Sequence, residues 1–400
     1  MPGPQSNVQP ELTSRDGVRW HAVGVLSAVL GLRMLGLFMV LPVLALHVRD
    51  MPGATAIAAG LALGIYGLTQ ALFQLPFGWL SDRWGRKPVI FLGLLLFAAG
   101  SVMAASATTP FWLIAGRALQ GSGAISAAVI ALVGDLTPDN RRTRVMALIG
   151  IIIGMAFILA FVVGPALSAW IGVEGLFWLT AAFAVAGMLL VMPLAAPRPV
   201  PRADLLSLRT VFPLVIPQAA GIFALHAIMT ATFIAIPVLL VESLGIPQGR
   251  HGWVYLPVML GSLLILVPLI LLQERKSSWF ALSLAVLAVG LGQASIAFGV
   301  SSTVFYIALG LFFGGFNFVE ALFPATVSSI AGDRGRGAAL GIYATAQFIG
   351  AFAGGLLGGI LAVRGGPAAV LAGNAAVALI WLLVLMAYRH NLGAGLPKYP

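Results

Sequence analysis

The sequence predicts an all-α membrane protein in which twelve transmembrane helices form two six-helix pseudo-repeats. Three observations support this fold: the composition, the number of long apolar runs and an approximate internal repeat. Of the 400 residues, 60% are hydrophobic and only 8% are charged, whereas soluble domains carry roughly 25% charged residues. So few charges cannot cover a water-facing surface, and the absence of cysteine excludes a disulfide-stabilised scaffold.

Each predicted helix is an apolar run of about 20 residues, which is the length that crosses the hydrocarbon core of a bilayer. Helices are expected because they satisfy their backbone hydrogen bonds internally in lipid, and the sequence lacks the alternating ten-residue segments of a transmembrane barrel. In chain order, the runs occupy residues 20–47, 54–79, 89–107, 111–134, 145–170, 175–196, 211–241, 251–272, 279–299, 302–330, 337–362 and 367–388.

The basic residues assign the two sides of the membrane. With both chain ends on one side, that side receives 17 of the 22 Lys and Arg residues, and the other side receives only Arg49, Arg250 and Arg364. Because cytoplasmic loops are rich in Lys and Arg, both termini are expected in the cytoplasm. The net charge of +10 then reflects topology, and nucleic acid is not an expected partner.

An approximate repeat divides the chain into two halves. Residues 34–44 resemble residues 229–239, and residues 144–148 resemble residues 336–340, at nearly equal offsets. Two parallel six-helix repeats around a central site are typical of transporters. The predicted organisation is a cytoplasmic tail (1–19), a first half (20–196), a cytoplasmic linker (197–210), a second half (211–388) and a cytoplasmic tail (389–400).

The loop after the second predicted helix carries four charges and two glycines within ten residues. Gly78 permits close helix approach, and Gly85 permits a tight turn. Asp82 can accept hydrogen bonds at the positive start of a helix, and Arg86 offers two donors to a carboxylate. From these residues alone, the loop could equally be a solvated turn on the cytoplasmic side.

Four ionisable residues lie inside the predicted helices: Arg33, Arg117, His226 and Glu320. A charge at the bilayer centre costs at least ~2.5–3.5 kcal/mol, so each is a candidate functional residue. Glu320 and His226 are candidate proton carriers, because imidazole changes its charge near neutral pH and a carboxyl group can load and release a proton as a cavity opens. Arg33 is a candidate counter-ion for a carboxylate or substrate. The alternatives are a structural arginine, a hydrogen-bonded structural histidine and a glutamate near the cytoplasmic mouth.

Polar and aromatic side chains within the helices suggest a substrate cavity. The candidates are Tyr66, Gln70, Gln120, Asn317, Tyr343 and Gln347. Each could instead form a hydrogen bond between helices. The Gly-x-x-x-Gly patterns at residues 60–64, 150–154 and 350–354 predict helix-packing faces.

The sequence shows no nucleotide-binding loop, metal-ligand cluster or catalytic triad. We therefore expect no enzyme activity, cofactor or bound metal, and a proton gradient would be the energy source. An ATP-driven pump would need an ATPase domain, which these loops cannot contain. The expected partners are the lipid bilayer, protons and a small-molecule substrate, and we expect a monomer.

The loop at residues 78–90 resembles motif A of the major facilitator superfamily, G-x-L-a-D-r-x-G-r-k. Residues 113–124 resemble motif B of the drug:proton antiporters in that superfamily, and residues 36–44 resemble their motif D. Motif C in the fifth helix is degenerate, because Ala160 and Ser168 occupy two of its glycine positions. The resemblance extends over the whole chain and implies a secondary transporter that works by alternating access.

The resemblance also implies a cytoplasmic latch that holds the outward-open state. Asp82 would meet the start of helix 11 near Gly337, and Arg86 would pair with an acid at the end of helix 4, which is Asp135 here. From the residues alone, Asp135 could be a solvated charge at a helix end. The latch would comprise Gly78, Asp82, Gly85, Arg86, Lys87 and Asp135. Arg117, within motif B, would modulate proton transfer.

The sequence thus predicts proton-coupled antiport or efflux of small amphipathic or drug-like compounds. The alternatives are a proton symporter or uniporter for a nutrient and, from another class, a membrane sensor or enzyme. Residues 32–42 and 315–324 further resemble one bacterial member of the superfamily, which carries a small soluble domain after its twelfth helix. This likeness implies the bacterial inner membrane, and the chain would be a short relative or a shortened form.

Overall fold

The computed structural model describes residues 19–195, 208–275, 277–299 and 301–387. The predicted tails, apart from residue 19, and most of the predicted linker, including Arg198 and Arg202, lie outside these residues. Within the described ranges, every regular element is a helix and no strand occurs. The predicted all-α membrane fold is therefore confirmed.

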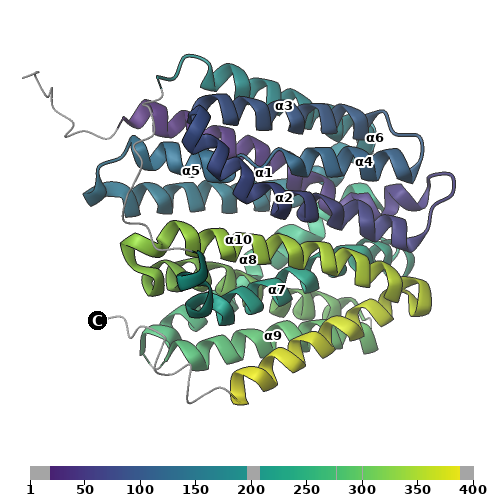
Figure 1. Ribbon diagram of the computed structural model, residues 1–400. Coiled ribbons are helices and arrows are strands. Elements are labelled where there is room, and N and C mark those ends of the chain that lie inside the picture. Colours follow the sequence, from purple (N-terminus) through teal and green to yellow (C-terminus); the bar gives the residue numbers. More distant parts are fainter. Residues whose placement is uncertain (1–18, 196–207, 276, 300, 388–400) are drawn as a thin grey trace, which may run out of the picture.

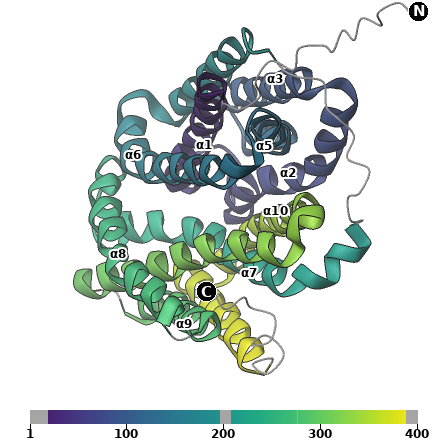
Figure 2. The same ribbon diagram turned by 90° about the vertical axis from the view of Figure 1, so that its left-hand side faces the viewer.

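The helices lie side by side along a common direction, and the two halves of the chain form two groups (Figure 1). The first half contains α1 (Trp20–Arg49), α2 (Ala56–Trp84), α3 (Arg86–Ala105), α4 (Pro110–Ser122), α5 (Ser126–Asp135) and α6 (Asp139–Val191). The second half contains α7 (Leu208–Glu242), the 3₁₀ turn η1 (Gln248–Arg250), α8 (His251–Arg275), α9 (Ser278–Phe298) and α10 (Ser302–Ala387). Figure 2 shows the same two groups in an end-on view.

Glycines fold the long helices back across the membrane. Ten helical segments of the described chain are apolar and long enough to span, and two of them are 52 and 53 residues long. The first of these turns at Gly172, and the second turns at Gly365 and Gly366. Gly172 and Gly366 have φ values of +73° and +63°, which glycine adopts without strain. Dividing both segments at these turns gives twelve spans, as predicted.

The fourth span differs from the prediction, because it is broken between α4 and α5. The Gly123 carbonyl at this break accepts a hydrogen bond of 3.0 Å from Arg33 Nη2 of α1. The backbone of Gly123 also lies against α3, where an added Cβ would meet the Gly93 carbonyl oxygen at 2.2 Å. Contacts with two other helices therefore stabilise the break, and these contacts are invisible in the local sequence.

The two halves touch closely at one end of the bundle. There, an added Cβ on Gly60 of α2 would lie 2.1 Å from the Gly355 carbonyl oxygen of α10, and one on Gly67 would lie 2.5 Å from the Phe348 carbonyl oxygen. An added Cβ on Gly252 of α8 would similarly meet the Val162 oxygen of α6 at 2.1 Å. Small residues allow such backbone contact between membrane helices.

Two of the three predicted Gly-x-x-x-Gly packing faces are confirmed. Residues 60–64 pack against α10, and residues 350–354 pack against the backbone of α7 at Phe223 and Ala227. The prediction for residues 150–154 is wrong within this chain, because an added Cβ on Gly150 or Gly154 would meet nothing within 4 Å. These two glycines lie on a part of α6 that no neighbouring helix covers closely.

We call the end of the bundle that carries Arg86, Arg142 and Arg275 the basic end, and the other the opposite end. The opposite end is also joined by polar contacts, since Arg49 of α1 forms an ion pair with Glu242 of α7 and Gln248 donates to Ser168 Oγ at 3.1 Å. Packing between the halves is looser toward the basic end. A Cβ on Gly341 would have Leu75 as its nearest neighbour at 3.7 Å, and one on Gly337 would meet nothing within 4 Å.

Candidate functional site

Glu320, His226 and Gln347 come together in the second half. Gln347 Nε2 donates a hydrogen bond of 2.9 Å to Glu320 Oε1 and lies 2.9 Å from His226 Nε2. Glu320 Oε2 lies 3.9 Å from His226 Nε2. His226 comes from the middle of α7, and the other two residues come from different spans of α10. Two predicted proton carriers and one predicted cavity residue therefore form a single cluster.

The orientation of the Gln347 amide implies one tautomer of His226. An amide nitrogen only donates, so the Nε2 atom that faces Gln347 must accept. The ring proton is then on Nδ1, which lies 3.3 Å from the Ile222 carbonyl oxygen and donates to it. His226 is neutral in this arrangement. A second proton on Nε2 would face the amide N–H group, so the Gln347 amide would have to turn.

Glu320 is more accessible than His226. Its side chain is 36% exposed, against 9% for His226. The Oε2 atom is nevertheless buried and accepts no hydrogen bond from the described residues. A buried carboxylate oxygen without a donor is unfavourable, so Oε2 is an unsatisfied acceptor among the described residues.

Aromatic rings separate this cluster from the opposite end. The Phe316 ring lies 5.7 Å from the His226 ring and 6.3 Å from the Phe157 ring of the first half. Farther toward the opposite end, Phe161 of α6 contacts Phe233 at 4.8 Å and Tyr255 at 5.6 Å, measured between ring centroids. These rings come from both halves and pack against one another on the side of the Glu320 cluster that faces the opposite end.

Two other predicted cavity residues lie near this cluster. Tyr343 precedes Gln347 by one helical turn. Its buried Oη neither donates nor accepts a hydrogen bond among the described residues. Asn317 Nδ2 instead reaches Ser262 Oγ of α8, at 3.4 Å. Asn317 is therefore part of a contact between two helices rather than of the carboxylate cluster.

Arg33 is buried among polar groups of the first half. Its Nη2 donates to Gln70 Oε1 at 2.8 Å and to the Gly123 carbonyl at 3.0 Å, and Gln70 donates to Gln74 Oε1 at 3.0 Å. Only 2% of Arg33 is exposed. Within the described ranges, no carboxylate forms an ion pair with this guanidinium group.

Arg117 is buried in a second network beside the first. It donates to the Ala62 carbonyl at 3.1 Å and to Gln120 Oε1 at 2.9 Å, and Gln120 donates to Ser101 Oγ at 2.7 Å. The Tyr66 ring lies between the two arginines, 5.9 Å from Arg33 and 5.0 Å from Arg117. Tyr66, Gln70 and Gln120 were predicted as cavity residues, and the structure places them as buried partners of the arginines.

The loop between α2 and α3 is organised around Arg86. Its guanidinium group donates to Asp82 Oδ1 at 2.5 Å, to Ser81 Oγ at 2.7 Å and to Asp135 Oδ2 at 3.2 Å. Gly85 separates the two helices with a φ of +98°, a conformation that favours glycine. The structure thus brings the motif A arginine and the acid at the end of α5 together.

Lys87 and Gly78 have different surroundings. Lys87 Nζ donates to the Met192 and Leu194 carbonyls, at 2.5 and 3.1 Å, and so caps the end of α6. The nearest neighbour of a Cβ on Gly78 would be Ala127 of the same half, at 3.9 Å.

Asp82 is held by Arg86 of its own half, and the space beside Gly337 of α10 is open. In this conformation the predicted contact between Asp82 and helix 11 is not formed.

The sequence singles out Asn374 as a further cavity candidate, and the structure instead places it in a buried polar network that was not predicted. Asn374 Nδ2 donates to Gln293 Oε1 at 3.0 Å and to Thr232 Oγ1 at 3.1 Å, and Thr232 donates to Gln293 Oε1 at 3.2 Å. These residues join α7, α9 and α10. Each is a polar residue in a largely apolar span, which was the available signal. Because all are uncharged, the network is suited to holding helices together.

Comparison with known proteins identifies the family. Residues 26–331 and 218–397 match the family model described as Major Facilitator Superfamily. The chain is 42% identical over 372 residues to the inner membrane transport protein YajR of Escherichia coli (strain K12), a match that covers 90% of this chain and 81% of that protein. YajR is the bacterial member that residues 32–42 and 315–324 resemble.

Two further proteins are similar over different lengths. The multidrug resistance protein MdtL of Escherichia coli (strain SMS-3-5 / SECEC) is 31% identical over 205 residues, which is 48% of this chain and 51% of that protein. The crystal structure of a POT family transporter in complex with 5-aminolevulinic acid has a TM-score of 0.73 at 15% identity, covering 92% of this chain and 96% of that chain. The likeness to the POT family transporter shows the fold. The match to the family model and the 42% identity to YajR show the family. The chain belongs to the major facilitator superfamily and is a membrane transporter.

Proposed function

We propose that the chain is a proton-coupled exporter of small amphipathic compounds, and that Glu320 carries the proton with His226 and Gln347. The observation that carries this proposal is the Glu320–Gln347–His226 cluster, which joins three spans by two hydrogen bonds of 2.9 Å. Ionisable groups inside membrane helices mark proton pathways. In this cluster, a proton added to Glu320 or to His226 must change the hydrogen bonds of Gln347. It therefore changes the contacts that the helix carrying Gln347 makes with the other two spans.

The location of the cluster fits alternating access. The excess of Lys and Arg assigns the basic end to the cytoplasm, so the tightly packed opposite end would face outward. The aromatic rings around Phe161, which come from both halves, would then exclude outside water, and the partly exposed Glu320 would communicate with the cytoplasmic side. An inward-facing state of this kind would release a proton to the cytoplasm and take up its export substrate there.

The loop around Arg86 supports a role in the reverse transition. Closing the basic end would bring Asp82 toward the start of helix 11, where the space beside Gly337 is open. A carboxylate next to helix N–H groups is favourable, so this contact would stabilise the outward-facing state. The Arg86–Asp135 pair, formed within the first half, would hold the loop ready for it.

The energy source would be the proton gradient, without a cofactor. One proton moving inward across the membrane yields about 2.3 kcal/mol per 100 mV of potential. Coupling requires proton and substrate to bind the two conformations differently. The similarity to a multidrug resistance protein and the ring-lined interior favour amphipathic compounds. The working unit would be a monomer in the bacterial inner membrane with both termini in the cytoplasm.

Proteoliposomes with an internal pH dye test this function against its alternatives. An antiporter moves protons when a substrate gradient runs in the opposite direction, and a compound panel would reveal the substrate. A symporter would move protons in the same direction as substrate, and a uniporter would transport substrate without protons. Failure of every compound to cross the membrane would favour a sensor or an enzyme.

A further inference from the structure

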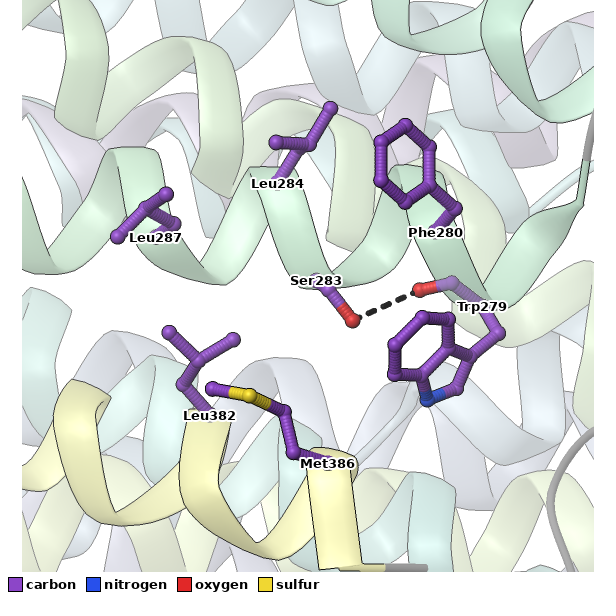
Figure 3. Close-up of a pocket in the computed structure, with 7 residues that line it drawn as sticks. All are labelled: Trp279, Phe280, Ser283, Leu284, Leu287, Leu382 and Met386. Atoms are coloured by element: carbon purple, nitrogen blue, oxygen red, sulfur yellow. Dashed lines mark hydrogen bonds between the residues drawn. The ribbon is translucent and has the colours of Figure 1, made fainter. Parts of the chain in front are cut away.

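An apolar groove lies between α9 and the last span of α10 at the basic end (Figure 3). Its volume is about 410 Å³, within the roughly 300–1,000 Å³ that is usual for small-molecule sites. It is lined by Trp279, Phe280, Ser283, Leu284, Leu287, Leu382 and Met386. Trp279 and Leu287 are eight residues apart, so the groove extends about 12 Å along α9.

The walls of the groove present hydrocarbon. Ser283 is the only polar side chain apart from the Trp279 indole, and its hydroxyl donates to the Trp279 carbonyl at 2.9 Å. The Trp279 indole N–H donates across to the Leu385 carbonyl of α10 at 3.1 Å. Both polar groups are thus satisfied within the protein, and the indole ring is fixed at the mouth of the groove. A ligand inside would meet apolar atoms only.

An exposed arginine precedes the helix that carries Trp279. Arg275, the exposed last residue of α8, is two positions before Ser277, which caps α9 by accepting from the Phe280 N–H at 3.1 Å. Glu274 is the only acid among residues 270–280. Positive charge beside an apolar groove at a membrane surface complements an anionic lipid.

We propose that this groove binds one acyl chain of an anionic phospholipid from the cytoplasmic leaflet, with its phosphate beside Arg275. Tryptophan is enriched at the membrane interface, which places the Trp279 ring at the level where headgroup and acyl chain meet. The leaflet assignment rests on the cytoplasmic position of the basic end in the proposed function. Lipid binding itself is independent of transport, so the two can fail separately.

The test uses the purified full chain in phosphatidylcholine vesicles that contain dibrominated phosphatidylglycerol. Bromine quenches nearby tryptophan, and comparison with Trp279→Phe isolates the Trp279 signal. We expect half-maximal quenching at a roughly tenfold lower fraction of brominated phosphatidylglycerol than of brominated phosphatidylcholine, because cations at the surface favour anionic lipid. Equal quenching by both lipids would overturn the proposal.

Two matched pairs of variants locate the site. Ser283→Phe fills the groove and should abolish the preference, whereas Leu264→Phe, on an exposed position of α8, should keep it. Arg275→Gln should weaken the preference, and Arg250→Gln at the opposite end should not. If Ser283→Phe does not fold, the comparison of Arg275→Gln with Arg250→Gln still decides whether the site exists. Identical preferences in Arg275→Gln and Arg250→Gln would show a general lipid annulus and no site.

Discussion

Glu320 and His226 form no direct hydrogen bond, since Oε2 and Nε2 lie 3.9 Å apart, and the Gln347 amide joins them instead. This relationship makes the amide sensitive to both protonation states. Gln347 lies on the helix that follows Glu320 across the membrane, and His226 lies on α7. A proton on either group therefore changes a contact between different spans.

Gln347→Leu should remove both hydrogen bonds and reduce coupled transport about ten- to hundredfold, because the bond to the Glu320 carboxylate is a hydrogen bond to a charged group, which contributes about 1.5–3 kcal/mol. The measurement is substrate-driven proton flux in proteoliposomes across a pH series, where the pH optimum should also move. Thr345→Val is the matched control, since the Thr345 hydroxyl donates only to the Gly341 carbonyl of its own helix. Equal losses in both variants would contradict a bridging role for Gln347.

Arg49→Gln should favour opening of the opposite end. The Arg49–Glu242 pair joins the two halves there and is about half exposed, so its loss should shift the equilibrium by no more than about fivefold, given roughly 0.2–1 kcal/mol for an exposed pair. Ser168→Cys labelling by an impermeant maleimide measures the opening. The exchanged pair Arg49→Glu with Glu242→Arg should restore the slow labelling. Labelling that is unaffected by Arg49→Gln would rule out this pair as a gate.

Gly355→Ala should separate α2 from α10, because the added Cβ would lie 2.4 Å from the Gly60 carbonyl oxygen. Overpacking typically costs about 1–3 kcal/mol of stability. Here it destabilises the conformation in which Gly355 contacts Gly60. We expect a larger outward-facing population and at least severalfold slower transport, measured by maleimide accessibility and by flux. Gly150→Ala is the control, because its Cβ meets nothing within 4 Å. Slower transport in the control would indicate a general effect of replacing glycine.

Asp82→Asn should leave the free energy of unfolding nearly unchanged, since this side chain is 63% exposed and exposed ion pairs contribute about 0–1 kcal/mol. Transport should nevertheless fall severalfold, because the outward-facing state loses a carboxylate at the start of helix 11. Gly78→Val should act similarly, although this conformation has room for the larger side chain. Arg83→Gln in the same loop is the control. Normal transport in both Asp82→Asn and Gly78→Val would leave the loop with a topological role only.

The sequence predicted the spans well, because apolar length reports directly on membrane crossing. It also identified Glu320, His226 and Gln347 one by one, since polar residues in apolar runs are conspicuous. Their meeting in space depends on how α7 and two spans of α10 pack, and a single sequence does not contain that information. The break between α4 and α5 was missed for the same reason, because Arg33 and α3 stabilise it from outside.

The sequence did not reveal the partners of the polar residues assigned to a cavity. Tyr66, Gln70 and Gln120 surround the two buried arginines. A signal was available, because a guanidinium group in an apolar span needs oxygen acceptors, and the nearest polar residues on adjacent helices are the natural source. The sequence could predict that Gly60 lies on a helix-packing face. It could not predict that the partner on that face is Gly355 of α10.

The most direct test of the proton-carrier role compares substrate-induced proton flux in proteoliposomes of the natural chain and of Glu320→Gln. Gln keeps the volume and a hydrogen-bond acceptor for Gln347 but cannot load or release a proton. We predict that the variant folds, loses gradient-driven transport and retains at most downhill exchange, while His226→Gln shows a milder loss with a shifted pH optimum. Unchanged coupled flux in Glu320→Gln would contradict the assignment of Glu320 as the proton carrier.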